Sequence, residues 1–286
     1  MKTYSMPAAD VLCITIPCIC CGGKVFKPFL DCEEFNFVSC VSCTLVLRNP
    51  QPIQDEITVR YSKTFGNDYL SYELKNEDAF LKLQQLALKD AGFDKLEKRY
   101  FAALQEAPHV LDIGCATGAL LVSLRENGWS VTGVEISPCA AHAREIRNLD
   151  VRDTLLQDNK FPDKSFDVVL ASHLIEHLND PKAFLLEVHR ILKDDGVFFI
   201  TTPNISGFQA RLFKEHWRSA IFDHLYLFSV RTIKNILKNT GFKTESIHTW
   251  GGLAAGTAPK WIKKSADFLA KHFGCGDVMI VRVKKY

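Results

Sequence analysis

Two pairs of cysteines near the beginning of the chain have the spacing of metal ligands. Cys18 and Cys21 form the first pair, Cys40 and Cys43 the second, and 18 residues separate the pairs. Two tight turns spaced in this way can each present two thiolates to one tetrahedral Zn²⁺. Because four thiolates leave no open position for water or substrate, we expect a structural zinc site that helps a small module to fold.

Other cysteines in this region leave the ligand set open. Cys20 could replace Cys18 or Cys21 as a ligand, and Cys13 and Cys32 are spare. The alternative is that these side chains pack as small hydrophobic residues. Seven of the ten cysteines fall within the first 43 residues, and we see no export signal. We therefore expect a reducing, cytoplasmic environment rather than disulfides.

A second motif, VLDIGCATG at 110–118, predicts a strand, a glycine-bearing turn and a helix that begins near residue 119. Such a turn brings the backbone close to a nucleotide. Asp112 would repel the pyrophosphate of a dinucleotide. Ala116 and Ala119 also replace two glycines of the dinucleotide pattern. We therefore favour S-adenosylmethionine, whose ammonium and sulfonium groups tolerate a nearby acid.

Glu135 ends the next predicted strand, 21 residues after Gly114. A carboxylate at this place can accept hydrogen bonds from both ribose hydroxyls of a nucleotide. Taken together, Asp112 and Glu135 are a more specific signal than either residue alone. The alternative interpretations are a solvated acid at a strand end for Glu135 and an N-cap role for Asp112.

From residue 108 onward, β-type runs alternate with helical patterns, which is typical of a parallel sheet covered by helices on both faces. The predicted strands are 109–113, 130–135, 166–171, 197–202, 243–249 and 278–283, with a weaker one near 149–152. The predicted parts are a zinc-ribbon-like module over 1–48, a helical connector over 49–107 and a cofactor-binding domain over 108–286.

Four motifs in order carry a resemblance to a known family. They are VLDIGCATG at 110–118, VTGVE at 131–135, FPDKSFDVVLASHLIEHLNDP at 161–181 and ILKDDGVFFITTPN at 191–204. In these motifs the chain resembles the class I S-adenosylmethionine-dependent methyltransferases over roughly 108–286. The resemblance implies an α/β, Rossmann-like, seven-stranded sheet. With its cysteine-rich head, the chain also looks like a group of methyltransferases often linked to sugars and other small metabolites.

The resemblance also implies a cofactor site built from the ends of the strands. The implied residues are Asp112, Gly114, Ala116 and Gly118 around the methionine and ribose, Glu135 on the ribose, Ser172 and His173 at the methionine, and Asp153, ahead of Asp158, as the acid that contacts adenine.

Methyl transfer is an in-line displacement, so the protein mainly aligns the acceptor, and one general base suffices. The candidate bases are His173, Glu176, His177 and His224, because each follows a strand end. His173 and His177 are four residues apart and could share one face of a helical turn, as metal ligands could. A structural role in the core is the alternative for each histidine.

Two further features leave their roles open. Trp217 and Tyr226 could stack on a flat or sugar-like acceptor or belong to the core. Residues 251–275 interrupt the last two strands and predict an amphipathic helix with a basic face, including Trp261, Lys263 and Lys264. Such a helix packs on the body or serves as a lid, a dimer surface or a membrane-surface contact.

The composition restricts the class of protein. Hydrophobic residues make up 47% and charged residues 24% of 286 residues, as in a soluble globular chain and not a disordered one. No apolar run reaches the ~18 residues of a membrane span, and the run at 11–16 is too short for a signal peptide. The net charge is +2, and residues 1–60 carry five basic and six acidic residues. The charge balance therefore gives no strong nucleic-acid signal.

We expect methyl transfer from S-adenosylmethionine to a small-molecule acceptor, such as a sugar, a sugar nucleotide or another metabolite, with a histidine as general base. The alternatives are an RNA or protein methyltransferase and a non-catalytic S-adenosylmethionine-binding partner protein. The acceptor, the methylated atom and homodimer formation stay open.

Overall fold

The structure, a computed structural model, describes residues 12–33, 35–54, 56, 66–252, 267, 270–271 and 273–286. Most of the predicted amphipathic helix, with Trp261, Lys263 and Lys264, lies outside these residues. In the part of the chain that the structure describes, no helix has both the length and the apolar character needed to cross a membrane.

A seven-stranded sheet forms the centre of the molecule. Its strands are β6 (His109–Ile113), β7 (Ser130–Val134), β8 (Val151–Arg152), β9 (Phe166–Ser172), β10 (Leu192–Pro203), β12 (Phe242–Trp250) and β13 (Val278–Lys285). The order is β12-β13-β10-β9-β6-β7-β8, and the ladders from β10 to β8 are parallel, whereas β13 is antiparallel to both of its neighbours. This arrangement confirms the predicted Rossmann-like fold. β10 begins at Leu192, five residues before the predicted start.

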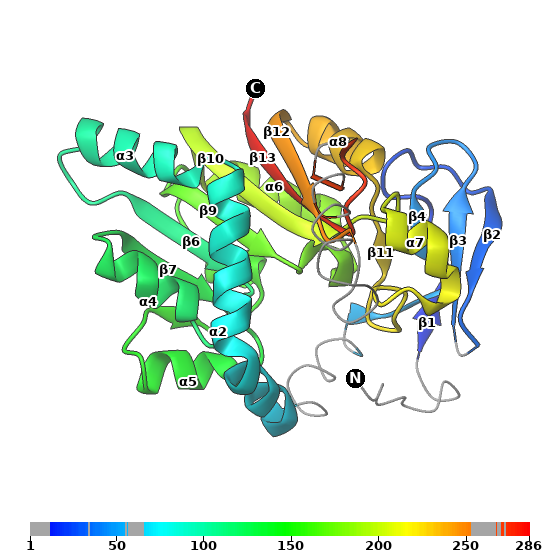
Figure 1. Cartoon of the computed structure of the whole chain (residues 1–286), viewed down its shortest axis with the longest axis horizontal. Helices are drawn as coiled ribbons and strands as arrows, with labels where there is room; N and C mark the ends of the chain where they lie inside the picture. Colours follow the sequence, from blue (N-terminus) through cyan, green and yellow to red (C-terminus); the bar gives the residue numbers. More distant parts are fainter. Residues whose placement is uncertain are drawn as a thin grey trace.

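Helices cover both faces of the sheet (Figure 1). α2 (Gly66–Asp90), α3 (Phe93–Ala103) and α4 (Ala119–Glu126) pack on one face, which takes Val168 and Leu170 of β9. α6 (Pro181–Ile191) and α8 (Val230–Asn239) pack on the other face, which takes Val169 and Ala171. Alternate residues of one strand thus enter opposite cores, which explains its continuous apolar run. α5 (Cys139–Glu145) packs beside β8, and α7 (Phe208–Phe213) follows β10.

Local sequence sets where two of these helices begin. The Asp180 side chain accepts a hydrogen bond from the Ala183 amide at 2.9 Å, and Pro181 opens α6. Ser229 and Thr232 form a reciprocal capping box at the start of α8. Both arrangements satisfy amide groups that would otherwise have no partner at a helix N-terminus.

The cysteine-rich part contributes to a second sheet that extends beyond it in sequence (Figure 1). Its strands, in order, are β11 (Tyr226–Leu227), β4 (Val46–Arg48), β3 (Asn36–Cys40) and β2 (Phe26–Asp31). β11 lies between β10 and α8 in the chain, yet Tyr226 pairs with Leu47 of β4. A small ladder also joins β1 (Cys13–Ile14) to β5 (Gln51–Pro52). The domain boundaries drawn from sequence stay predictions.

Arg48 connects β4 to the segment 222–225 that leads into β11. Its amide donates to the Leu225 carbonyl at 2.8 Å, and its Nη1 donates to the Phe222 carbonyl at 2.8 Å. The guanidinium carbon lies 3.9 Å from the centroid of the Phe222 ring. The side chain is 6% exposed overall, so these contacts are largely desolvated.

Replacement of Arg48 by Met should lower the free energy of unfolding by about 2 kcal/mol, because a desolvated hydrogen bond and a cation–π contact are lost. Urea denaturation measures this change. Lys24→Met, at an exposed position, is the matched control and should shift the midpoint little. A variant as stable as the wild type would contradict the role that we assign to Arg48.

Candidate active site

The turn between β6 and α4 requires residues that tolerate a left-handed backbone. Gly114 has φ 76° and Gly118 has φ 78°, and Ala116 between them has φ 47°. A Cβ added at Gly118 would lie 2.5 Å from the Leu149 side chain. The Gly114 amide donates to the Val134 carbonyl at 2.7 Å, which holds the turn against β7. Glycine is therefore needed in this motif for two reasons: the backbone is left-handed at both glycines, and at Gly118 there is no space for a side chain.

Asp112 and Glu135 lie at the carboxyl ends of the neighbouring strands β6 and β7, and both are almost fully buried. Burial and the nearby Glu135 carboxylate raise the pKa of Asp112 to about 7. Among the described residues, none donates a hydrogen bond to the Asp112 carboxylate or pairs with it. Glu135 accepts hydrogen bonds from the amides of Ala116 at 3.0 Å and Ser137 at 2.8 Å. The first carboxylate lacks a partner, and the second is held rigidly.

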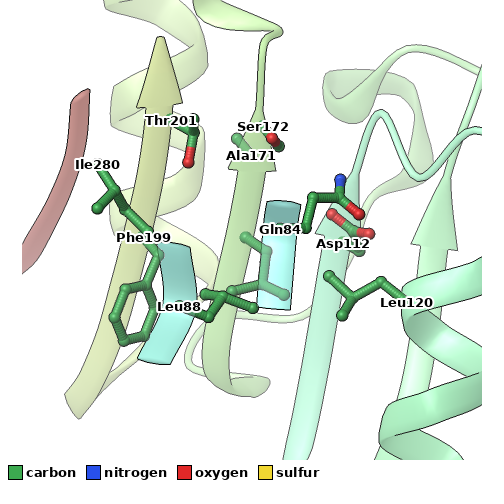
Figure 2. Close-up of a pocket in the computed structure, with 10 residues that line it drawn as sticks. Gln84, Leu88, Asp112, Leu120, Ala171, Ser172, Phe199, Thr201 and Ile280 are labelled. Carbon is green, nitrogen blue, oxygen red and sulfur yellow. The ribbon is translucent and has the colours of Figure 1, made fainter. Parts of the chain in front are cut away.

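A cavity lies between α2 and the sheet, near the carboxyl ends of the central strands; its empty volume of about 270 Å³ includes space open to solvent. Figure 2 shows Asp112, Ser172 and Thr201, from three adjacent strands, lining it. Gln84 and Leu88 line it from α2. The carboxyl edge of an open parallel sheet is where such folds bind ligands. The cavity brings together the predicted residues Asp112 and Ser172.

Glu176 is the centre of a second polar cluster. Its side chain is fully buried in η4 (Ile175–His177), where Oε2 accepts from the Thr202 hydroxyl at 3.0 Å. Oε1 faces His173 Nδ1 at 3.3 Å. Burial raises the pKa of Glu176, but His173, His177 and His224 outweigh it and lower that pKa to about 2. Glu176 is therefore ionised at neutral pH.

The three predicted histidines surround this carboxylate in different settings. His173 directly follows β9 at φ 52°, and its side chain is 49% exposed. The rings of His177 and His224 lie 4.6 Å apart, and each Nδ1 contacts a backbone carbonyl. Burial, followed by the His177 charge, lowers the pKa of His224 to about 3. Glu176, His177 and His224 each offer a ligand atom within 4.8 Å of the others, so the three could also hold a metal ion.

Three other candidates lie away from the cavity lining. Asp153 has a side chain that is 61% exposed and pairs with Arg144 at 3.0 Å. Trp217 is buried and donates to Asp277, and the buried Tyr226 hydroxyl donates to the Asn179 carbonyl at 3.1 Å. Both aromatic residues therefore belong to the core, which was one of the two roles left open for them.

The four predicted metal-ligand cysteines converge. The sulfur atoms of Cys18, Cys21, Cys40 and Cys43 all lie within 4.8 Å of one another. Tetrahedral zinc–thiolate bonds of about 2.3 Å would space the sulfurs by about 3.8 Å, so the cluster fits such an ion. The Cys20 thiol instead donates to the Thr232 carbonyl at 3.7 Å.

The two turns that hold these cysteines share one backbone pattern. Gly22 and Thr44 follow the second cysteine of each pair, with φ 73° and 67°. Their amides donate to the carbonyls of Cys18 and Cys40, at 2.7 and 2.9 Å. Burial raises the pKa of Cys40, but hydrogen bonds from the backbone of Cys43 and Ser42 bring it down to about 7. Thr44 thus takes the left-handed conformation that glycine takes in the first turn.

Sequence reasoning missed the part of the site that comes from α2. Gln84 and Leu88 are i, i+4 neighbours on one face of this helix, and Glu73 and Glu77 continue that face. The face is apolar at Leu88 and polar at the other three positions. The available signal was three polar residues at helical spacing, in line with the apolar Leu88.

Comparison with known proteins identifies the family. A family model described as a methyltransferase domain matches residues 83–247. A ubiquinone biosynthesis O-methyltransferase from Caulobacter vibrioides is 34% identical over 137 residues, which cover 44% of this chain and 50% of that protein. A sphingolipid C9-methyltransferase from Komagataella phaffii is 26% identical over 242 residues, which cover 73% and 49%. The chain thus spans about half the length of the curated relatives it matches.

Solved structures support the same fold. A S-adenosylmethionine-dependent methyltransferase from Archaeoglobus fulgidus has a TM-score of 0.52 at 21% identity and covers 75% of this chain and 99% of its own. A possible histamine N-methyltransferase from Thermotoga maritima has a TM-score of 0.52 at 20% identity, with 77% and 99% covered. Because the matched family region includes more than half of the 286 residues, with the glycine turn and both polar clusters, the chain belongs to the methyltransferase-domain family.

Proposed function

We propose that this protein transfers a methyl group from S-adenosylmethionine to a small-molecule acceptor. The observation that carries the proposal is the Asp112 carboxylate, which is 2% exposed, lines the cavity and has no partner among the described residues. A buried carboxylate without a partner costs free energy that a cationic ligand recovers. S-adenosylmethionine brings an ammonium and a sulfonium, whereas the pyrophosphate of a dinucleotide would be repelled.

Glu135 supports the same ligand. Both of its oxygens already accept backbone amides, which fixes the carboxylate, and each oxygen keeps a further lone pair. Ribose hydroxyls can donate to these positions. In this proposal Gly114, Ala116 and Gly118 let the backbone approach the methionine and ribose, and Ser172 and His173 lie at the methionine end. Asp153 keeps its proposed place near adenine.

His173 is the residue that we propose as general base. Its Nδ1 faces the ionised Glu176, an arrangement that orients the imidazole and leaves Nε2 to take the acceptor proton. His173 follows Ser172, which lines the cavity, so the base lies next to the proposed methyl donor. His224 is a weaker base because its lowered pKa makes the imidazole give up a proton readily. His177 and His224 act by holding Glu176 in place.

The methyl transfer itself needs few groups. The acceptor atom forms a bond to the methyl carbon as the carbon–sulfur bond breaks, and the positive charge leaves the sulfur. S-adenosylmethionine supplies the methyl group, and the chain aligns the reactants and removes one proton from the acceptor. The printed activities of the relatives concern ubiquinone biosynthesis and sphingolipids, which supports a small or lipidic acceptor. A sugar acceptor rests on the resemblance alone.

The thiol cluster is proposed to hold a structural zinc ion through Cys18, Cys21, Cys40 and Cys43. The sulfur spacing and the backbone amides directed at the Cys40 sulfur suit thiolate ligands. The role of the ion would be to fold the small N-terminal sheet, because four thiolates leave it no open position.

The cofactor assignment can be tested with Glu135→Ala. We expect its affinity for S-adenosylmethionine to fall by more than about tenfold, because two ribose hydrogen bonds to a charged acceptor are lost. Isothermal titration calorimetry of the folded variant and of Glu126→Gln, an exposed acid on α4, makes the comparison. Unchanged affinity in Glu135→Ala would refute the ribose assignment. If the folded wild type binds neither S-adenosylmethionine nor S-adenosylhomocysteine, the proposed function is wrong.

The metal assignment can be tested with Cys40→Ser. The purified variant should lose the one equivalent of zinc expected in the wild type, because a hydroxyl is a poor zinc ligand beside three thiolates. Elemental analysis measures the metal. Cys13→Ser, at an exposed position outside the cluster, should keep it. Full zinc in Cys40→Ser would refute the proposed ligand set.

The setting of His224 gives a pH-dependent prediction. Its pKa is about 3 in the folded chain and about 6.5 when unfolded, so the unfolded chain binds its proton first as pH falls. The stability that His224 contributes is thus complete above pH ~6.5 and is lost as pH falls towards 3. His224→Asn should remove about 2 to 3 kcal/mol of the loss between pH 6.5 and 4.5.

Urea denaturation of the wild type and His224→Asn at several pH values measures this loss. Asn keeps a donor for the Ser219 carbonyl. His216→Asn, an exposed histidine in the same segment, is the control. Parallel pH profiles of stability for the wild type and His224→Asn would contradict a lowered pKa of His224 in the folded chain.

A further inference from the structure

α2 is tied to the glycine turn by a single acidic side chain. Glu77 accepts a hydrogen bond from the Thr117 hydroxyl, and Thr117 belongs to the turn between β6 and α4. Arg147 pairs with the same carboxylate at 2.6 Å, and both side chains of this ion pair are about four-fifths buried. These bonds hold the helix directly over the proposed cofactor site.

One face of α2 runs along this site. Glu73, Glu77, Gln84 and Leu88 recur at spacings of four and seven residues, so they share a face of the helix. Gln84 points into the cavity beside Asp112 (Figure 2). Glu73 and Gln84 are 11 residues apart, which spans about 16 Å at about 1.5 Å per residue. A nucleoside with an extended amino-acid tail has a comparable length.

The surroundings of Glu73 relate it to the ribose end of the site. Burial, together with the charges of Glu135 and Glu77, raises the pKa of Glu73 to about 7, although a hydrogen bond with Tyr69 opposes this rise. Glu73 lies one helical turn before Glu77, which accepts from Thr117, and the amide of the adjacent Ala116 donates to Glu135. These contacts put this turn of α2 close to the proposed ribose acid. The nearby cation Arg147 pairs with Glu77. At the other end, the buried Asp112 carboxylate lines the cavity without a partner among the described residues.

Building on the proposed function, we propose that α2 forms a wall of the cofactor site and selects the charged cofactor. Glu73 lies beside Glu135 at the ribose and sulfonium of S-adenosylmethionine, and Gln84 lies beside Asp112 at its methionine group. S-adenosylmethionine carries one more positive charge than the product S-adenosylhomocysteine. Crowded carboxylates favour the charged ligand, so the wall helps to release the product. The family match begins at residue 83, so Glu73 and Glu77 lie outside it.

The test compares the dissociation constants of the two ligands for the full-length protein by isothermal titration calorimetry. Glu73→Gln should weaken S-adenosylmethionine about fivefold or more and S-adenosylhomocysteine less than about twofold, because one carboxylate facing the sulfonium is lost. Gln84→Leu should weaken both ligands by a similar factor, because both carry the methionine group. Asp78→Asn, at an exposed position on the same helix, is the matched control and should change neither constant.

The outcomes separate this inference from the proposed function. If the wild type binds both ligands and Glu73→Gln leaves their ratio unchanged, the inference is overturned and the proposed function stands. If the folded wild type binds neither ligand, both are overturned. Should Glu73→Gln melt well below the control, Glu73→Asp gives the second comparison. That variant keeps the charge and should keep the wild-type ratio, and a ratio that shifts as in Glu73→Gln would overturn the role of the charge.

Discussion

The cost of burying carboxylates at the carboxyl edge of the sheet is the constraint on which the rest of the site depends. An ionised acid removed from water needs a hydrogen-bond donor or a cation, or it holds its proton more tightly. Asp112 lies at the end of β6, Glu176 lies in η4 just after the adjacent strand β9, and the two acids meet this need in opposite ways. Three histidines and a threonine hydroxyl compensate Glu176 and lower its pKa, whereas Asp112 has a raised pKa and an open cavity in front of it.

The carboxyl edge of the sheet therefore has two parts. In one part the charge of Glu176 is compensated by neighbouring side chains, and in the other the Asp112 carboxylate faces a cavity. The charge of Glu176 is already compensated by its neighbours, Thr202 at Oε2 and His173 at 3.3 Å from Oε1. In the proposed mechanism, His173 takes the acceptor proton while Glu176 stays in place. In the proposed function, a cationic ligand offsets the cost of burying the Asp112 carboxylate. Gln84 of α2 lines the same cavity as Asp112. In the proposed reaction, methyl transfer removes the positive charge from the sulfur, which would weaken the binding of the product beside these carboxylates.

Local patterns in the sequence predicted the elements and residues that depend on neighbours in the chain. The glycine turn, the acid at the end of β7 and the alternation of strands and helices all have local causes. The role of α2 did not follow, because helical spacing predicts a face but not what that face covers. β11 is only two residues long and pairs with a strand about 180 positions earlier, so nothing nearby in sequence marks it. Thr44 likewise takes a glycine-like conformation that its residue type disfavours.

The N-terminal sheet affects the acceptor side through the segment that carries His224. Leu225, the next residue, donates its amide to the Glu176 carbonyl and accepts from the Arg48 amide, both at 2.8 Å. β11, which follows directly, pairs with β4 in the N-terminal sheet. Cys40 of the thiol cluster is the last residue of β3 in the same sheet. A short segment held from both sides has little freedom to shift, so the position of His224 against Glu176 depends on the folding of the N-terminal sheet. In this proposal, a structural zinc ion at the N-terminal cysteines would help to hold the buried His224 in place beside Glu176, which orients the proposed base His173.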